Sequence, residues 1–111
     1  MKGLNSVKMR GYLSWAKLSV TSNGYPKFTA KLSIPVVYQS GGEQKEGKSY
    51  HNVCAWGPIA EALGDMLDGT PIEIEGTLNS RKYESPCKEC QTMSTKYWTE
   101  VQINTFIIVN E

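Results

Sequence analysis

Two large aromatic residues, Tyr50 and Trp56, are the side chains of this sequence best suited to bind a flat ligand by stacking. They lie six positions apart, an even spacing, so on a β-strand both rings project from the same face. Val53 and Ala55 project from the opposite face and suit a core, which places the two rings on the outer face. Rings on an open strand face suit the stacking of unpaired nucleic-acid bases. The segment therefore predicts a base-binding surface.

A second candidate site is the Cys87-Lys88-Glu89-Cys90 motif. A Cys-x-x-Cys pair supplies half of a four-ligand zinc site, but the sequence has one further cysteine, Cys54, and one histidine, His51. A complete structural zinc site would therefore need two cysteines from each of two subunits. A disulfide and reduced, unpaired thiols are the alternatives, and reduced thiols without a cofactor are the favoured interpretation. A redox role is a distant possibility, because the loop offers no helix N-terminus to lower a thiol pKa.

Charge and composition restrict the classes of function. The net charge of +1 excludes a polycation, so nucleic-acid binding has to rest on a local basic patch combined with stacking. A single histidine and the absence of a phosphate-binding GxxxxGK motif argue against a hydrolase or a nucleotide-dependent enzyme. We therefore expect a protein that is not an enzyme.

The same features predict the compartment. No apolar run approaches the roughly 18 residues of a membrane span, and the N-terminus carries no signal-peptide run. Three cysteines, an odd number, argue against a secreted disulfide framework. We expect a cytoplasmic protein without a membrane partner.

The elements that must position these residues are mainly strands, identified by period-two alternation of apolar residues. With 111 residues, one domain covering 1–111 is expected. The expected strands are 6–13, 28–38, 50–56, 72–83 and 96–109. A helix is expected over 58–68, where Pro58 suits its first position and Gly69 its end. The segment 15–21 is expected to be irregular, and the polar segments 39–49 and 84–95 are expected to be loops, the first a mobile hairpin arm.

Five strands with one short helix between the third and fourth form the topology of an all-β, five-stranded oligonucleotide-binding (OB) fold barrel. The sequence also resembles the single-stranded DNA-binding proteins of bacteria and their phages over residues 5–109. The resemblance is densest in YHNVCAWGPIAEAL, in DGTPIEIEGTLNSRKY and in YWTEV. It implies the same OB fold, and sequence-independent binding and protection of single-stranded DNA in replication, recombination and repair.

The resemblance also implies roles for individual residues. Four aromatic residues fall where the family stacks bases along one DNA track: Tyr38, Tyr50, Trp56 and Tyr83. His51 falls at a subunit contact, which implies a homo-oligomer, with a tetramer favoured over a dimer. Separately, the basic residues Lys8, Arg10, Lys31, Lys48, Arg81 and Lys82 are candidates for phosphate contacts. For Lys8, Lys31 and Lys48, an ordinary solvated side chain is an equally good interpretation.

Two tryptophans match no role in the family. Trp98 is interpreted as a packing residue, and Trp15 as a loop contact to DNA or to a neighbouring subunit. The family often has basic residues where this sequence has Asn52, Pro58 and Asp68, which implies weaker electrostatic binding.

The family also usually continues into a glycine- and proline-rich tail with an acidic tip. The sequence stops soon after the fifth strand, which implies a trimmed or tail-less version from a bacterial cell, a plasmid or a phage-infected host. The alternative function is an OB-fold protein-interaction module, such as a primosome-type or structural subunit, whose aromatic face binds a protein.

Overall fold

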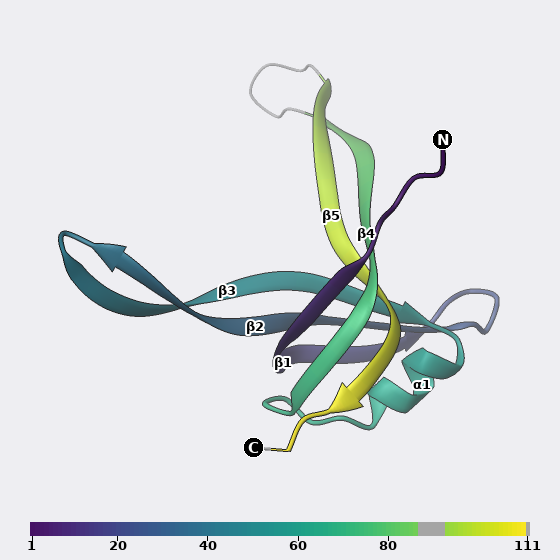
Figure 1. Ribbon diagram of the computed structural model, residues 1–111. Helices are drawn as coiled ribbons and strands as arrows, with labels where there is room; N and C mark the ends of the chain where they lie inside the picture. Colours follow the sequence, from purple (N-terminus) through teal and green to yellow (C-terminus); the bar gives the residue numbers. More distant parts are fainter. Residues whose placement is uncertain (87–92, 111) are drawn as a thin grey trace.

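The computed structural model describes residues 1–86 and 93–110, with side chains described for 1–82 and 97–110. Five strands, β1 (Val7–Val20), β2 (Pro26–Ser40), β3 (Glu43–Trp56), β4 (Pro71–Pro86) and β5 (Met93–Ile108), close into a barrel in the order β1-β2-β3-β5-β4. One helix, α1 (Pro58–Gly64), lies between β3 and β4. The expected five-stranded OB barrel is confirmed (Figure 1).

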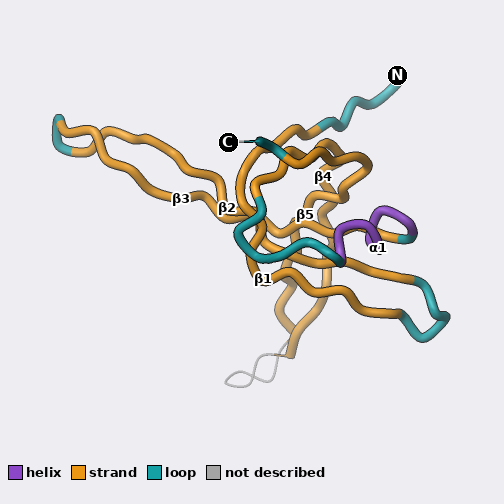
Figure 2. Tube along the Cα trace, turned by 90° about the horizontal axis from the view of Figure 1, so that it is seen from below, coloured by secondary structure: helices purple, strands orange, loops and turns teal. Residues whose placement is uncertain are grey.

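Two hairpins extend beyond the barrel as arms. The β2–β3 arm projects from the side of the barrel opposite α1 in both views, and the β4–β5 arm rises at a steep angle to it (Figures 1 and 2). In the part of the chain that the structure describes, no helix is long and apolar enough to cross a membrane.

The barrel core is built from the inward positions of all five strands and from α1. Phe28, Ala30 and Leu32 alternate along β2, and each is buried, as their period-two spacing predicts. From α1, Ala60 and Leu63 are fully buried and pack against the same cluster. Burying these side chains contributes roughly 1.5–3 kcal/mol for each large residue, so the core fixes which face of every strand is left outside.

A short parallel ladder closes the barrel. In the described part of the chain, β3 and β5 are joined by two residue pairs, Val53 with Val101 and Cys54 with Gln102. Beyond this ladder the two strands diverge, each into its own arm (Figure 1).

A β-bulge interrupts β1 at Trp15 and Ala16, which together face one residue of β2. The extra residue of the bulge reverses which positions of β1 point inward. The alternation of apolar and polar residues, from which a strand is predicted, is therefore interrupted after Ser14. The expectation of an irregular segment over 15–21 was therefore wrong, because β1 remains paired with β2 as far as Val20.

The β2–β3 arm is a regular hairpin. The expected hairpin arm over 39–49 is therefore present, but apart from its two-residue turn it is paired strand, and the expectation of a loop was wrong. Ser40 pairs with Glu43 across a two-residue turn at Gly41 and Gly42, whose φ angles are 62° and 82°. Positive φ at both turn positions is typical of the tight type I′ turn, for which glycine is well suited. The polar side chains of this segment bury little apolar surface, but the strands are joined by backbone hydrogen bonds, which form without such burial.

The boundaries of β4, β5 and α1 also differ from the predictions. Backbone pairing extends β4 to Pro86 and starts β5 at Met93, so part of the expected loop over 84–95 is strand. The helix ends at Gly64 instead of near Asp68. A side chain at Gly64 would come within 2.6 Å of Leu18, so α1 ends where it packs closely on β1.

Candidate nucleic-acid interface

The register of the β2–β3 hairpin assembles one continuous outer face. Lys27 pairs with Trp56, and Ser33 pairs with Tyr50. Paired residues of an antiparallel ladder share a face, so the two predicted stacking residues lie on the same surface. Their side chains are exposed, at 59% for Tyr50 and 37% for Trp56. The predicted alternation of β3, with both rings outside, is thus present in the structure.

A small aromatic cluster surrounds Trp56. The ring of Tyr25 stacks on it with centroids 6.3 Å apart and planes inclined by 26°, and the ammonium of Lys27 lies 4.9 Å from the ring centroid. Tyr25 is held in the turn between β1 and β2, where its backbone N–H donates to Thr21 Oγ1 at 3.1 Å. The sequence interpretation missed both neighbours. The register set by the turn at Gly41 is the signal that would have placed Lys27 opposite Trp56.

A second aromatic group lies across β1, β2 and β3. Ser14, Trp15, Lys31 and Tyr50 line a cavity of about 350 Å³. The Trp15 side chain is 72% exposed, and the ammonium of Lys31 lies 4.5 Å from its ring centroid. Lys31, a predicted phosphate contact, therefore lies between two exposed rings, and Trp15, interpreted as a loop residue, belongs to the strand surface.

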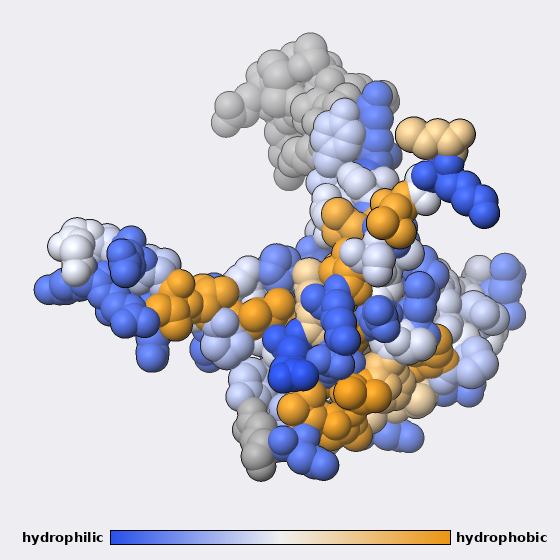
Figure 3. Space-filling model, viewed as in Figure 1, coloured by the Kyte–Doolittle hydropathy of each residue, from blue (hydrophilic) through white to orange (hydrophobic). Residues whose placement is uncertain are grey.

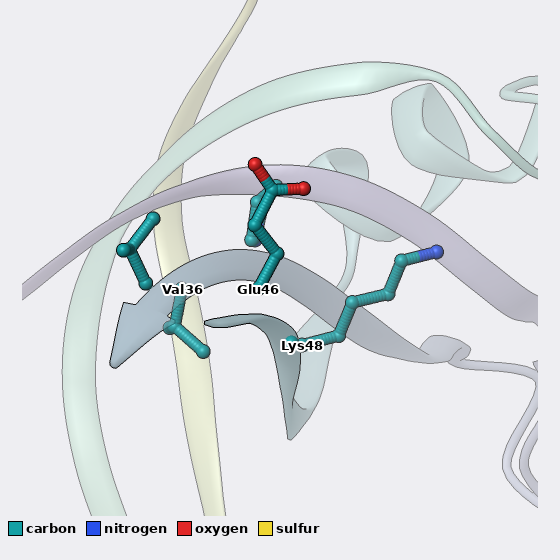
Figure 4. Close-up of a pocket in the computed structure, with 6 residues that line it drawn as sticks. Val36, Glu46 and Lys48 are labelled. Atoms are coloured by element: carbon teal, nitrogen blue, oxygen red, sulfur yellow. The ribbon is translucent and has the colours of Figure 1, made fainter. Parts of the chain in front are cut away.

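Lys48 extends this surface onto the β2–β3 arm. It shares the face of Tyr50, and both line a hollow of about 330 Å³. A further hollow of about 350 Å³ lies beside Lys48 on the arm, lined also by Val36 and Glu46. The side chains of Glu46 and Lys48 extend in different directions there (Figure 4), so the ammonium remains available to an anion.

Tyr38 is separated from the other predicted stacking residues. It pairs with Lys45 and is 48% exposed. Along β2 it lies five positions from Ser33, the partner of Tyr50, and an odd spacing places it on the opposite face of the ribbon. The structure therefore does not join Tyr38 to the surface of Tyr50, and its stacking role stays a prediction.

On the β4–β5 arm, the carboxylate of Glu100 is the centre of a polar group. It accepts a hydrogen bond from Trp98 Nε1 at 3.0 Å and pairs with the guanidinium of Arg81 at 3.3 Å. Trp98 is 41% exposed and has a polar partner, so its packing role stays a prediction. Arg81 is already paired, so a phosphate would compete with Glu100 for it.

The thiol of Cys54 is buried beside this group, on the outer side of β3. Burial and the adjacent Glu100 carboxylate, with which the thiol hydrogen-bonds, raise the pKa of Cys54 from an ordinary 9.0 to about 11. The thiol is therefore neutral and covered at physiological pH, and it gives the middle of the outer face no reactive group.

The other predicted site residues of the β4–β5 arm are not brought together with Arg81. Lys82 is exposed and pairs with Tyr97, which lies on the opposite ribbon face from Arg81. The side chain of Tyr83 lies outside the described residues, as do Cys87 and Cys90. Within the described part of the chain, no group of three or more His, Cys, Asp or Glu residues is arranged to hold a metal ion.

Lys8 and Arg10 lie on a different part of the barrel. Both face Glu73 from β1, at 4.0 Å for Lys8 Nζ and 2.8 Å for the Arg10 guanidinium. Nearby Glu75 pairs with Lys8 across the ladder. Two carboxylates offset the two cations here, so the structure does not bring these predicted phosphate contacts into the aromatic surface.

His51 lies next to Tyr50 but projects from the other side of β3. Its Nε2 is 2.6 Å from Ser49 Oγ, and its side chain is half-buried. This contact lies within one chain, so the predicted role of His51 at a subunit contact stays a prediction.

Comparison with known proteins agrees with this architecture. The model of the single-strand binding protein family matches residues 4–109. The Chlorobaculum tepidum protein named single-stranded DNA-binding protein 1 is 28% identical over 103 residues, covering 90% of this chain and 61% of that protein.

Two solved structures share the fold. A Plasmodium falciparum SSB complex with single-stranded DNA superposes with a TM-score of 0.82 at 18% identity, covering 99% of this chain and 98% of that one. A deletion mutant of the Thermus aquaticus single-stranded DNA binding protein gives a TM-score of 0.76 at 26% identity, covering 97% of this chain and 51% of that one. The chain thus spans between half and two thirds of the length of the C. tepidum and T. aquaticus proteins. Because the family model covers nearly every residue, the chain belongs to the single-strand binding protein family.

Proposed function

We propose that this chain binds single-stranded DNA without sequence preference and protects it during replication, recombination and repair. The observation that carries the proposal is the outer face of β1, β2 and β3, where Trp15, Tyr50 and Trp56 are exposed and Lys27 and Lys31 lie among them. Rings bind any base through its π-face, and cations follow the phosphates. Membership of the single-strand binding protein family supports the same conclusion.

The mechanism is equilibrium binding without covalent chemistry. Stacking contributes roughly 1–3 kcal/mol per base, as measured by alanine substitution. The cations add a salt-dependent contribution, with a slope of about −0.7 in log affinity against log salt for each neutralised phosphate of a single strand. Such DNA arises in the cytoplasm of a bacterium or a phage-infected cell, where we place the activity.

We also propose that the chain assembles as a homo-oligomer, a tetramer rather than a dimer. Apolar surface is visible along the β2–β3 arm and at the lower edge of the barrel (Figure 3). Exposed apolar residues include Val36 and Val37 on the β2–β3 arm and Ile107 and Ile108 at the end of β5. Burial of such side chains between subunits would stabilise an assembly, and several binding sites on one strand would raise the overall affinity.

The function is tested by titrating the chain with oligo(dT) of graded length at two salt concentrations, following tryptophan fluorescence. We expect quenching and an affinity that falls with salt. Trp56→Ala should weaken binding about 5- to 150-fold, the equivalent of roughly 1–3 kcal/mol. Leu67→Ala, which changes an exposed apolar residue of the loop after α1, is the matched control and should bind as the wild type does. Absence of quenching at low salt would refute the proposal and favour the protein-interaction module.

A further inference from the structure

Trp15 is presented to solvent by an unusual backbone. Its φ angle is +52°, and it is the one non-glycine residue with positive φ in the described chain. It occupies the first of the two bulge positions that face a single residue of β2, where bulges of the glycine type place glycine. Without the bulge, Trp15 would follow Ser14 on the opposite face and point into the barrel. With it, both residues line the outer cavity.

The bulge is held by hydrogen bonds on both sides. The backbone N–H of Ala16 donates to Asp68 Oδ1 at 3.1 Å. The neighbouring residue Leu13 donates its N–H to Thr70 O at 3.1 Å and accepts from the N–H of Gly69 at 2.6 Å. The exposed position of Trp15 is therefore fixed by the loop after α1, and it is not the result of a frayed strand end.

The cavity beside Trp15 has the chemistry of a nucleotide site. Its volume of about 350 Å³ falls in the range of roughly 300–1,000 Å³ usual for small-ligand sites. Two aromatic side chains, Trp15 and Tyr50, line it from β1 and β3, and Lys31 enters from β2 between them. A neutral apolar ligand would leave the ammonium unpaired, whereas a nucleotide offers both a flat base and an anionic phosphate.

We propose that this cavity, which we call the Trp15 subsite, holds one nucleobase of single-stranded DNA against Trp15 and Tyr50, with Lys31 on the adjacent phosphate. The inference rests on the proposed function and extends the DNA path from β3 across β2 onto β1. In the free chain the ammonium of Lys31 lies over the Trp15 ring. A phosphate beside the base is a stronger partner for it, so Lys31 turns to the phosphate when the base enters.

The test compares the oligo(dT) affinities of Trp15→Ala, Trp15→Phe and Lys31→Gln with that of the wild type. Trp15→Ala should weaken binding about 5- to 150-fold without changing the salt slope, and Trp15→Phe should recover most of the affinity. Lys31→Gln should reduce the slope by about 0.7. Val20→Ala, an exposed apolar residue of the same strand, should bind normally.

A second readout does not depend on affinity. In Trp56→Phe/Trp98→Phe, Trp15 is the remaining tryptophan, and oligo(dT) should quench its emission. If Trp15→Ala binds as the wild type does and this emission is unchanged, while Trp56→Ala is impaired, the Trp15 subsite is refuted and the proposed function stands. If the wild type fails to bind oligo(dT), the proposed function fails, and the subsite with it.

Discussion

The left-handed backbone at Trp15 predicts an inverted stability order for alanine and glycine at this position. In a regular strand, glycine is less stable than alanine by roughly 0.5–1 kcal/mol, because it loses more conformational entropy on folding. A side chain with Cβ in the left-handed region costs roughly 1–2 kcal/mol that glycine avoids. With φ at +52°, the second effect is larger, so Trp15→Gly should be more stable than Trp15→Ala by about 0.5–1 kcal/mol.

Lys17 is the matched control position. It is exposed, lies on the same strand two residues on, and pairs regularly with Thr29. There the usual order should hold, with Lys17→Gly less stable than Lys17→Ala by about 0.5–1 kcal/mol. The entropic contribution of glycine is common to both positions and cancels in the difference between the two pairs. That difference should be about 1–2 kcal/mol, the backbone cost itself.

The measurement is equilibrium urea unfolding of all four variants at one protein concentration, followed by circular dichroism. A shared concentration matters because self-association would make apparent stability depend on it. The reasoning is refuted if Trp15→Ala is as stable as Trp15→Gly while the order at Lys17 is normal. Confirmation would show that the fold tolerates an unfavourable backbone in order to expose an indole ring.

Two further predictions follow from the described structure. The pKa of Cys54 is raised to about 11, so the folded state binds the thiol proton more tightly than the unfolded chain does. The protonated thiol therefore stabilises the fold fully below pH 9. The free energy of unfolding should fall by about 2–3 kcal/mol as the pH rises from 9 to 11. Urea unfolding at graded pH should show this loss in the wild type and a flatter profile in Cys54→Ala, and identical profiles would contradict the assignment. For the proposed assembly, size-exclusion chromatography with light scattering at micromolar concentration should give four times the mass of one chain. Twice the mass of one chain would refute the tetramer, and the mass of one chain would refute self-association.

Much of the fold could be predicted from the sequence because the core imposes a simple pattern. Phe28, Ala30 and Leu32 alternate regularly along β2, and Ile72 and Ile74 have the same spacing in β4. Both sets are buried. The arms were harder to predict, because their ladders are formed by backbone groups and their side chains bury little, so hydrophobic periodicity carried no signal over 39–49.

The exposed aromatic surface of β1, β2 and β3 could be predicted only in part, because only some of its residues follow a regular alternation. Tyr50 and Trp56 lie on one regular strand, so their shared face followed from spacing alone. Tyr25 and Lys27 reach Trp56 through a turn and through the hairpin register, which depends on recognising Gly41 and Gly42 as the turn. Trp15 was assigned to a loop instead of to this strand surface, because a bulge breaks the alternation that sequence reasoning uses. Nothing local in the sequence indicates that a tryptophan has a left-handed backbone.

The two-pair ladder between β3 and β5 has a mechanical consequence. Past the pairs of Val53 with Val101 and Cys54 with Gln102, no described backbone hydrogen bond ties one arm to the other. A change in the angle between the arms is therefore resisted by no described backbone hydrogen bond between them, and the closed barrel does not depend on that angle.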